Sequence, residues 1–133
     1  MKQLKSCNVA IVSLLALFIA SCSTIAPGSD PVVVRAQQTI KQAKISMDAY
    51  VHLEDSYTTQ LKKINPNFHK LAESIRANGQ QWITDGMSAV ETYRSTKDQT
   101  ALNRALAVLS QAIADCQKYT SQAQSNGVAI NGQ

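Results

Sequence analysis

Apolar residues recur at intervals of three and four along most of the chain, which is the spacing of one face of an α-helix. The first run covers residues 32–64, and a single charged residue, Glu54, falls on its apolar face. Pro31 suits the first position of a helix, and Asn65-Pro66 suits the end of this helix and the beginning of the next. The positions on this face are Val33, Ala36, Ile40, Ala43, Met47, Tyr50, Glu54, Tyr57, Leu61 and Ile64.

A second run of apolar positions covers residues 66–94. The stretch Ala77-Asn78-Gly79 lies inside it, and a glycine in this setting is also typical of a helix end. The apolar positions nevertheless keep their phase across Gly79, and Gly86 follows on the same face. This favours one helix with a close-contact face over two helices with a turn between them. The positions are Phe68, Leu71, Ala72, Ile75, Gly79, Trp82, Ile83, Gly86, Ala89, Val90 and Tyr93.

A third run covers residues 97–125. Thr96 and Gln99 have the spacing of a capping box, and Asp98 suits the positive end of a helix dipole. Asn126-Gly127 predicts the end of the helix, and residues 127–133 are expected to form a frayed tail. The apolar positions are Leu102, Ala105, Leu109, Ala112, Cys116, Tyr119 and Ala123, with Leu106 and Ile113 beside them.

The three predicted helices are joined by connections too short for anything but antiparallel neighbours. Residues 32–126 are therefore predicted to form an all-α fold, an elongated up-down-up bundle of three helices. The alternation of apolar and polar residues that marks a strand is absent, and the run of valines at residues 32–34 is too short to matter. The bundle seam is rich in alanine and glycine, and large side chains are expected to fill its wider layers: Trp82, Tyr50, Tyr57, Phe68 and Tyr93.

The amino terminus has the pattern of a secretory signal. Residues 1–5 carry two lysines and no acid, and an apolar run follows at residues 9–20. A run of this length is too short for the roughly 20 residues that a membrane-spanning helix needs. Residues 1–21 are therefore predicted to be a signal peptide that the mature protein lacks.

The stretch Ile19-Ala20-Ser21-Cys22 resembles the lipobox of bacterial lipoproteins. The resemblance implies cleavage between Ser21 and Cys22, a diacylglycerol thioether on Cys22 and a further acyl chain on the new amino terminus, which together anchor a protein permanently. Ser23 stands where an aspartate, by resemblance to enterobacterial lipoproteins, would favour the inner membrane. The expected location is thus the periplasmic face of the outer membrane, with residues 22–31 as a flexible tether.

Net charge and the number of free cysteines both fall once the signal is removed. The net charge falls from +4 to half that value, because the signal peptide contains Lys2 and Lys5 and no acidic residue. The remaining charge gives no reason to expect nucleic-acid binding. Cys7 also leaves and Cys22 is alkylated, so no intramolecular disulfide is expected. Cys116 lies on an apolar face, which favours a small buried residue over a reactive thiol or a link between chains.

Candidate chemistry is sparse. The chain has no HExxH, CxxC, P-loop, GxGxxG or GxSxG motif, so no enzymatic activity and no cofactor are expected. Asp48, His52 and Asp55 share one helical face and are weak candidates for a metal site, although a solvated polar face explains them equally well. His69 and Glu73 are spaced for a surface pair.

Two further residues are candidates for interaction. Glu54 on an apolar face needs a partner or a neutral form. The simpler interpretation is a slight rotation that leaves it at the edge of the bundle, and the alternative is a polar contact that fixes the register or faces a ligand. Trp82 could anchor a partner protein, but a core position is preferred.

The first hypothesis from the sequence is a lipid-anchored envelope protein that acts through protein contacts or as a spacer. Its expected partners are the membrane, through the acyl chains on Cys22, and an unidentified envelope protein or a second copy. One alternative is a periplasmic module that binds a metal or small ligand at Asp48, His52, Glu54 and Asp55. A weaker one is a phage-derived lipoprotein associated with lysis. Uncharged glutamines that would tolerate self-association are Gln37, Gln38, Gln42, Gln80, Gln81, Gln111, Gln117, Gln122 and Gln124.

Overall fold

The computed structural model describes residues 28–129, and its ordered elements are three helices. Helix α1 spans Pro31–Ile64, α2 spans Asn67–Thr96 and α3 spans Thr100–Ser125. The predicted signal peptide, the cleavage site at Ser21, the lipidated Cys22 and most of the tether lie outside the described residues, as do residues 130–133. No strand occurs in the part of the chain that the structure describes.

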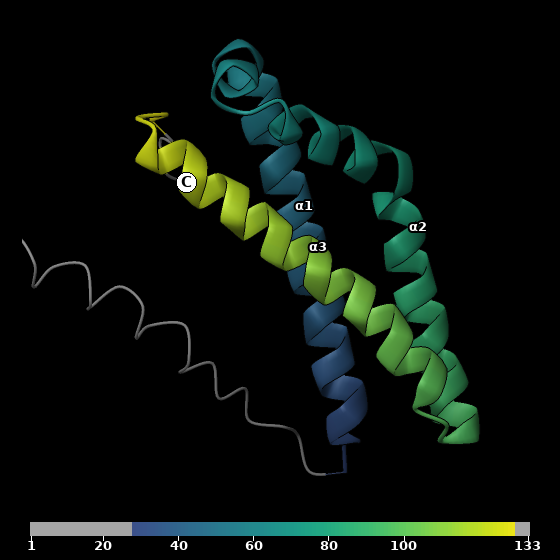
Figure 1. Cartoon of the computed structure of the whole chain (residues 1–133). Coiled ribbons are helices and arrows are strands. Elements are labelled where there is room, and N and C mark those ends of the chain that lie inside the picture. The colour runs from purple at the N-terminus through teal and green to yellow at the C-terminus, as the bar shows by residue number, and fades with distance from the viewer. Residues whose placement is uncertain (1–27, 130–133) are drawn as a thin grey trace, which may run out of the picture.

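The three helices form the predicted elongated antiparallel bundle, in which each helix packs against both others. Figure 1 shows α1 and α2 running in opposite directions, with α3 returning diagonally across them. Helix α2 bends along its length, so that its first part crosses the end of α1 and its second part runs beside α3. Within residues 28–129, no helix combines the length and the apolar character needed to cross a membrane.

The core consists largely of the predicted apolar faces. Five large aliphatic and aromatic side chains are fully buried, and together they come from all three helices: Tyr50, Leu61, Phe68, Leu102 and Leu109. Burial of such a side chain contributes about 1.5–3 kcal/mol, so packing accounts for the stability of a domain whose one cysteine within residues 28–129 is a free thiol. Leu53 is buried although the predicted face does not include it.

Helix α1 is distorted at Tyr57, which has φ −129° and ψ 24°, values that are not helical. On either side of it, Ser56 and Thr58 donate side-chain hydrogen bonds to the carbonyls four residues earlier, an arrangement often found where helices bend. The burial of Leu53 needs no distortion. Leu53 lies three residues after Tyr50 and four before Tyr57, so ordinary helical spacing places it beside the packed face, and the predicted face omitted it in error.

The connection between α2 and α3 differs from the prediction. Thr96 is the last residue of α2, and Lys97 follows with a positive φ of 60°, so the predicted capping box of Thr96 and Gln99 does not form. Instead Asp98 accepts a hydrogen bond from the backbone N–H of Thr100 at 2.8 Å. The chain must reverse between these helices, and the left-handed residue at position 97 achieves this before α3 begins.

The two glycines on the packed face of α2 lie in different surroundings. Helix α2 continues through Gly79, as the phase of the apolar positions predicted. A Cβ at Gly86 would lie 2.9 Å from Leu109 Cδ1 and 3.2 Å from Ile40 Cγ1, whereas a Cβ at Gly79 would meet Met47 Sδ at 3.4 Å. Of these two glycines, Gly86 is therefore the one at which the three helices approach one another more closely.

The residues after α3 do not fray at once, contrary to the prediction of a loose tail from residue 127. Val128 is buried, and its backbone N–H donates to the carbonyl of Ala123. The Tyr57 hydroxyl donates a hydrogen bond of 2.7 Å to the carbonyl of Ala129. An apolar side chain and an aromatic hydroxyl thus hold residues 127–129 against α1, a contact between distant segments that the glycine signal could not show.

Aromatic residues form a layer near the end of the bundle where α1 meets α2. The Tyr119 ring lies 5.1 Å from that of Phe68 and 6.4 Å from that of Tyr50, within the range of favourable tilted contacts. Tyr50 also donates a hydrogen bond to the Phe68 carbonyl at 3.0 Å. Of the other predicted large residues, Tyr93 is buried, and Tyr57 and Trp82 are partly buried.

Candidate functional site

The most unusual polar group of the bundle is Glu54, whose side chain is only 2% exposed. Its Oε1 lies 2.8 Å from Nδ1 of His69, and its Oε2 accepts a hydrogen bond of 2.8 Å from Nη2 of Arg76. Both partners belong to α2. The interpretation that left Glu54 at the edge of the bundle was wrong, and the alternative of a polar contact between helices is confirmed.

The surroundings of Glu54 favour its charged form. Burial raises the pKa of this carboxyl, but the hydrogen bonds from Arg76 and His69, together with their charges, lower it by more, so the net shift is downward. The hydrogen bond to Glu54 in turn raises the pKa of the Arg76 guanidinium. A carboxylate held as an anion, with both oxygens engaged, is suited to joining α1 to α2 rather than to donating a proton.

The cluster extends to the surface on both sides of Glu54. Nε2 of His69 lies 3.2 Å from the Glu73 carboxylate, which is the surface pair expected from the spacing of these residues. Arg76 Nη2 also donates to Asp55. Arg76 was missed at the sequence level because its position on the polar side of α2 is typical of a solvated residue. Only the packing of α2 on α1 brings it to Glu54.

A groove between α1 and α2 contains the residues proposed as metal ligands. It has a volume of about 610 Å³, and its lining includes Asp48, His52, Asp55 and Arg76. In residues 28–129, no group of three or more His, Cys, Asp or Glu side chains lies close enough together to hold a metal ion. Asp48 pairs with Lys44 instead, at 3.5 Å, and Asp55 contacts Arg76. The three candidates thus share a groove without forming a coordination sphere.

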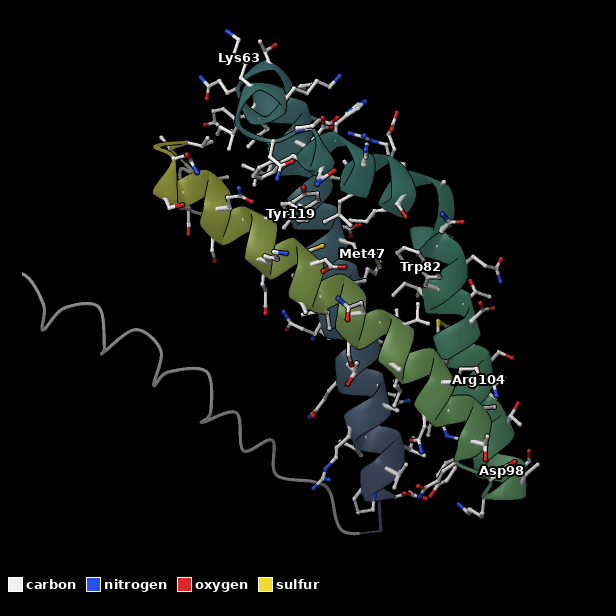
Figure 2. All side chains as sticks on the ribbon, viewed as in Figure 1. Met47, Lys63, Trp82, Asp98, Arg104 and Tyr119 are labelled. Carbon is white, nitrogen blue, oxygen red and sulfur yellow. The ribbon has the colours of Figure 1, made fainter. Side chains whose placement is uncertain are left out.

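A second groove lies between α2 and α3 and has a volume of about 530 Å³. Trp82 is partly buried at one side of it, and Val108 on α3 is 43% exposed at the other. Figure 2 shows Trp82 beside α3, with Arg104 further along the same pair of helices. Trp82 therefore lies only partly in the core, where it was predicted to lie, because one side of its indole ring faces this groove. Its complete lining is Trp82, Asp85, Ser88, Ala89, Thr92, Ala101, Arg104, Ala105 and Val108.

Cys116 lies in the core, with 2% of its surface exposed, as expected for a small buried residue. Burial raises the pKa of its thiol to about 12. The thiolate is the nucleophilic form of cysteine, so a thiol in this state is unreactive at neutral pH. The structure thus gives no support to a reactive thiol at position 116.

The comparisons with known proteins give no family. No protein-family model, no curated protein sequence and no solved structure matches this chain. The functional argument therefore depends on the side chains themselves: the buried Glu54 cluster, the α1–α2 groove and the α2–α3 groove.

Proposed function

We propose that this chain is a lipid-anchored protein of the cell envelope that acts without catalysis, through contact between the α2–α3 groove and a helix of a partner protein. The observation that carries the proposal is the half-open position of Trp82. Tryptophan is enriched among the residues that contribute most to binding at protein interfaces, where its large apolar ring is buried against a partner. Here the uncovered side faces a groove.

The lining of the α2–α3 groove has the composition of an interface. Small residues, Ala89, Ala101 and Ala105, lie along it, so another helix can approach closely. Val108 adds exposed apolar surface. Asp85 and Arg104 supply charged groups of both signs. An apolar centre with polar groups around it is typical of protein–protein contacts.

The anchor is supported by the residues before α1. The lipobox resemblance at residues 19–22 implies a lipid on Cys22, and the stretch from Ser23 to Asp30 joins that residue to α1 in the sequence. Asp30 caps that helix by accepting a hydrogen bond from the Val32 backbone N–H at 2.9 Å. At 1.5 Å per residue, the 34 residues of α1 extend about 50 Å from this point. The bundle can thus also serve as a spacer above the membrane.

Site-specific photo-crosslinking in cells tests the contact. A photoreactive amino acid at Val108, in the α2–α3 groove, should capture one defined partner, and the same amino acid at Ile45 should not. Ile45 is the matched control because it is also apolar and exposed, at 52%, but lies on α1. Trp82→Ala should abolish capture from position 108. Equal capture from both positions, or capture that survives Trp82→Ala, would reject the groove as the contact.

The alternative function, a module that binds a metal or small ligand, would use the α1–α2 groove. The groups available there include one imidazole, two carboxylates and two cations, the Lys44 ammonium and the Arg76 guanidinium. A ligand that binds only the folded form raises the melting temperature, so a shift on adding Zn²⁺ that His52→Ala removes would favour this function instead.

A further inference from the structure

The charges of the bundle are unevenly divided between its two ends. We use the term lysine tip for the end formed by residues 56–72, where α1 meets α2, together with residues 116–129 at the end of α3. These segments contain four lysines and neither an aspartate nor a glutamate. The lysines are Lys62, Lys63, Lys70 and Lys118, and all four are exposed.

The segments of the lysine tip lie together in space. The contacts of Phe68 with Tyr119, and of Tyr57 with Ala129, join α2 and the end of α3 to this end of α1. Lys63 lies at this end of the bundle in Figure 2, and Asp98 lies at the opposite end. Asp98 immediately follows Lys97, whose Nζ lies 3.2 Å from the Asp30 carboxylate just before α1. The lysine tip is therefore at the far end of the bundle from the point where the tether enters.

The lysines of the tip form no ion pair with a carboxylate of the described residues. Elsewhere in residues 28–129, some cations are paired and others are not. The paired ones are Lys44, Arg76, Arg94 and Lys97, and the unpaired ones are Arg35, Lys41 and Arg104. None of Lys62, Lys63 and Lys70 contacts a carboxylate there, and Lys118 lies over the Tyr119 ring, 5.6 Å from its centre. These positive charges are uncompensated by the fold itself.

We propose that the lysine tip docks on an anionic phospholipid membrane opposite the one that holds the anchor. Lysine is a point charge on a flexible stem, which suits a fluid layer of phosphate headgroups better than a fixed protein surface. The tip also lacks the apolar anchors of a protein interface, because the exposed large apolar residues of the described chain, Ile45, Met87 and Val108, all lie elsewhere.

The remainder of the bundle argues against docking on the same membrane. Residues 28–55 and 73–115 carry more acidic than basic residues, so laying this part flat on an anionic surface is unfavourable. An upright bundle places the tip about 50 Å from the tethered end. The tether of residues 23–30 can add at most about 28 Å when fully extended. This inference rests on the proposed function, since an opposite membrane has meaning only for an anchored chain.

The experiment uses the full lipidated chain and has two arms. In the first, the chain is mixed directly with vesicles of phosphatidylcholine alone or of equal parts phosphatidylcholine and phosphatidylglycerol, and the bound fraction is measured by co-flotation. In the second, the chain is first inserted into phosphatidylcholine vesicles, and capture of separate phosphatidylglycerol-containing vesicles is measured. Capture that depends on phosphatidylglycerol is the expected result.

Two matched variants locate the effect. In the tip variant, Lys62→Gln, Lys63→Gln and Lys70→Gln should reduce the phosphatidylglycerol-dependent partition coefficient roughly 100-fold, given the attraction of each lysine to an anionic surface. The control variant carries Arg35→Gln, Lys41→Gln and Lys44→Gln, which remove the same charge from exposed residues outside the tip, and it should retain capture. Circular dichroism checks that both variants keep the helical fold.

Each other outcome overturns a defined part of the account. Vesicle capture that does not depend on phosphatidylglycerol, or a phosphatidylglycerol-dependent increase in binding that falls equally in the control variant, rejects the lysine tip. A phosphatidylglycerol-dependent increase in direct binding without vesicle capture rejects docking on an opposite membrane. Failure of the chain to insert into phosphatidylcholine vesicles contradicts the anchor of the proposed function, and the first arm still tests the tip in that case.

Discussion

Arg76 on α2 donates a hydrogen bond of 2.8 Å to the buried carboxylate of Glu54 on α1, twenty-two residues earlier in the chain. His69 occupies the other oxygen of the same carboxylate at 2.8 Å. Glu54 and these two partners join α1 to α2 at one fixed register, because a shift of either helix by one residue would leave the buried Glu54 charge without its partners.

Removal of Arg76 should destabilise the fold. We expect Arg76→Ala to lower the free energy of unfolding by about 2–3 kcal/mol, because Glu54 is left buried with only His69. This range is below that for fully buried pairs, since the Arg76 side chain is 36% exposed and water can replace part of its contact. Urea unfolding measures the difference.

A double-mutant cycle separates the contact from other effects of Arg76. In a Glu54→Gln background no buried charge remains, so Arg76→Ala should then cost less than half as much. An equal cost in both backgrounds would mean that Arg76 acts through something other than Glu54.

Acid should weaken the fold through Glu54. The pKa of this group is lowered in the folded state, so its contribution to stability is present above the ordinary carboxyl pKa and is lost as the pH falls through the folded value. Between about pH 5 and pH 2, the wild type should therefore lose stability more steeply than Glu54→Gln. Parallel curves of unfolding free energy against pH for the two proteins would contradict the ion pair.

The two buried glycines of α2 should respond to alanine with opposite signs. Alanine favours a helix over glycine by about 1 kcal/mol. At Gly79 the nearest atoms of another helix belong to the flexible end of Met47, so Gly79→Ala should stabilise by up to about 1 kcal/mol. At Gly86 the new Cβ would meet the buried Leu109 and Ile40, so Gly86→Ala should destabilise by about 1–2 kcal/mol. Chemical denaturation of both variants decides, and equal effects would contradict the close approach at Gly86.

Cys116 should report unfolding by its reactivity. The thiol is buried and its pKa is raised to about 12, so a disulfide reagent at neutral pH should label it only when the core opens. In a chain with Cys7→Ser and Cys22→Ser, labelling should accelerate with urea in step with the loss of helix. Rapid labelling of the native protein would show that α3 is not packed as described.

The sequence predicted features that depend on neighbours within one helix, and it did not predict features that depend on how the helices pack together. Helical phase depends on neighbours along one chain, and it correctly placed Cys116 on a packed face and carried α2 through Gly79. It also put Glu54 on the apolar face of α1, although the preferred interpretation then moved this residue to the edge of the bundle, which was wrong. The partner of Glu54 depends on how two helices are matched in space. Arg76 therefore looked like any solvated arginine, and the anchoring of Val128 and Ala129 looked like a free end. The non-helical backbone at Tyr57 leaves no mark on the apolar pattern.

The lipid on Cys22 is the claim on which the envelope location and the orientation of the bundle depend. Mass spectrometry of the protein purified from membranes of its own cells tests it most directly, with Cys22→Ala as the control. We predict an amino-terminal peptide that begins at Cys22 and carries the mass of a diacylglycerol and an acyl chain, whereas Cys22→Ala should remain an uncleaved precursor. An unmodified Cys22, or processing unchanged in the Cys22→Ala variant, would contradict the account.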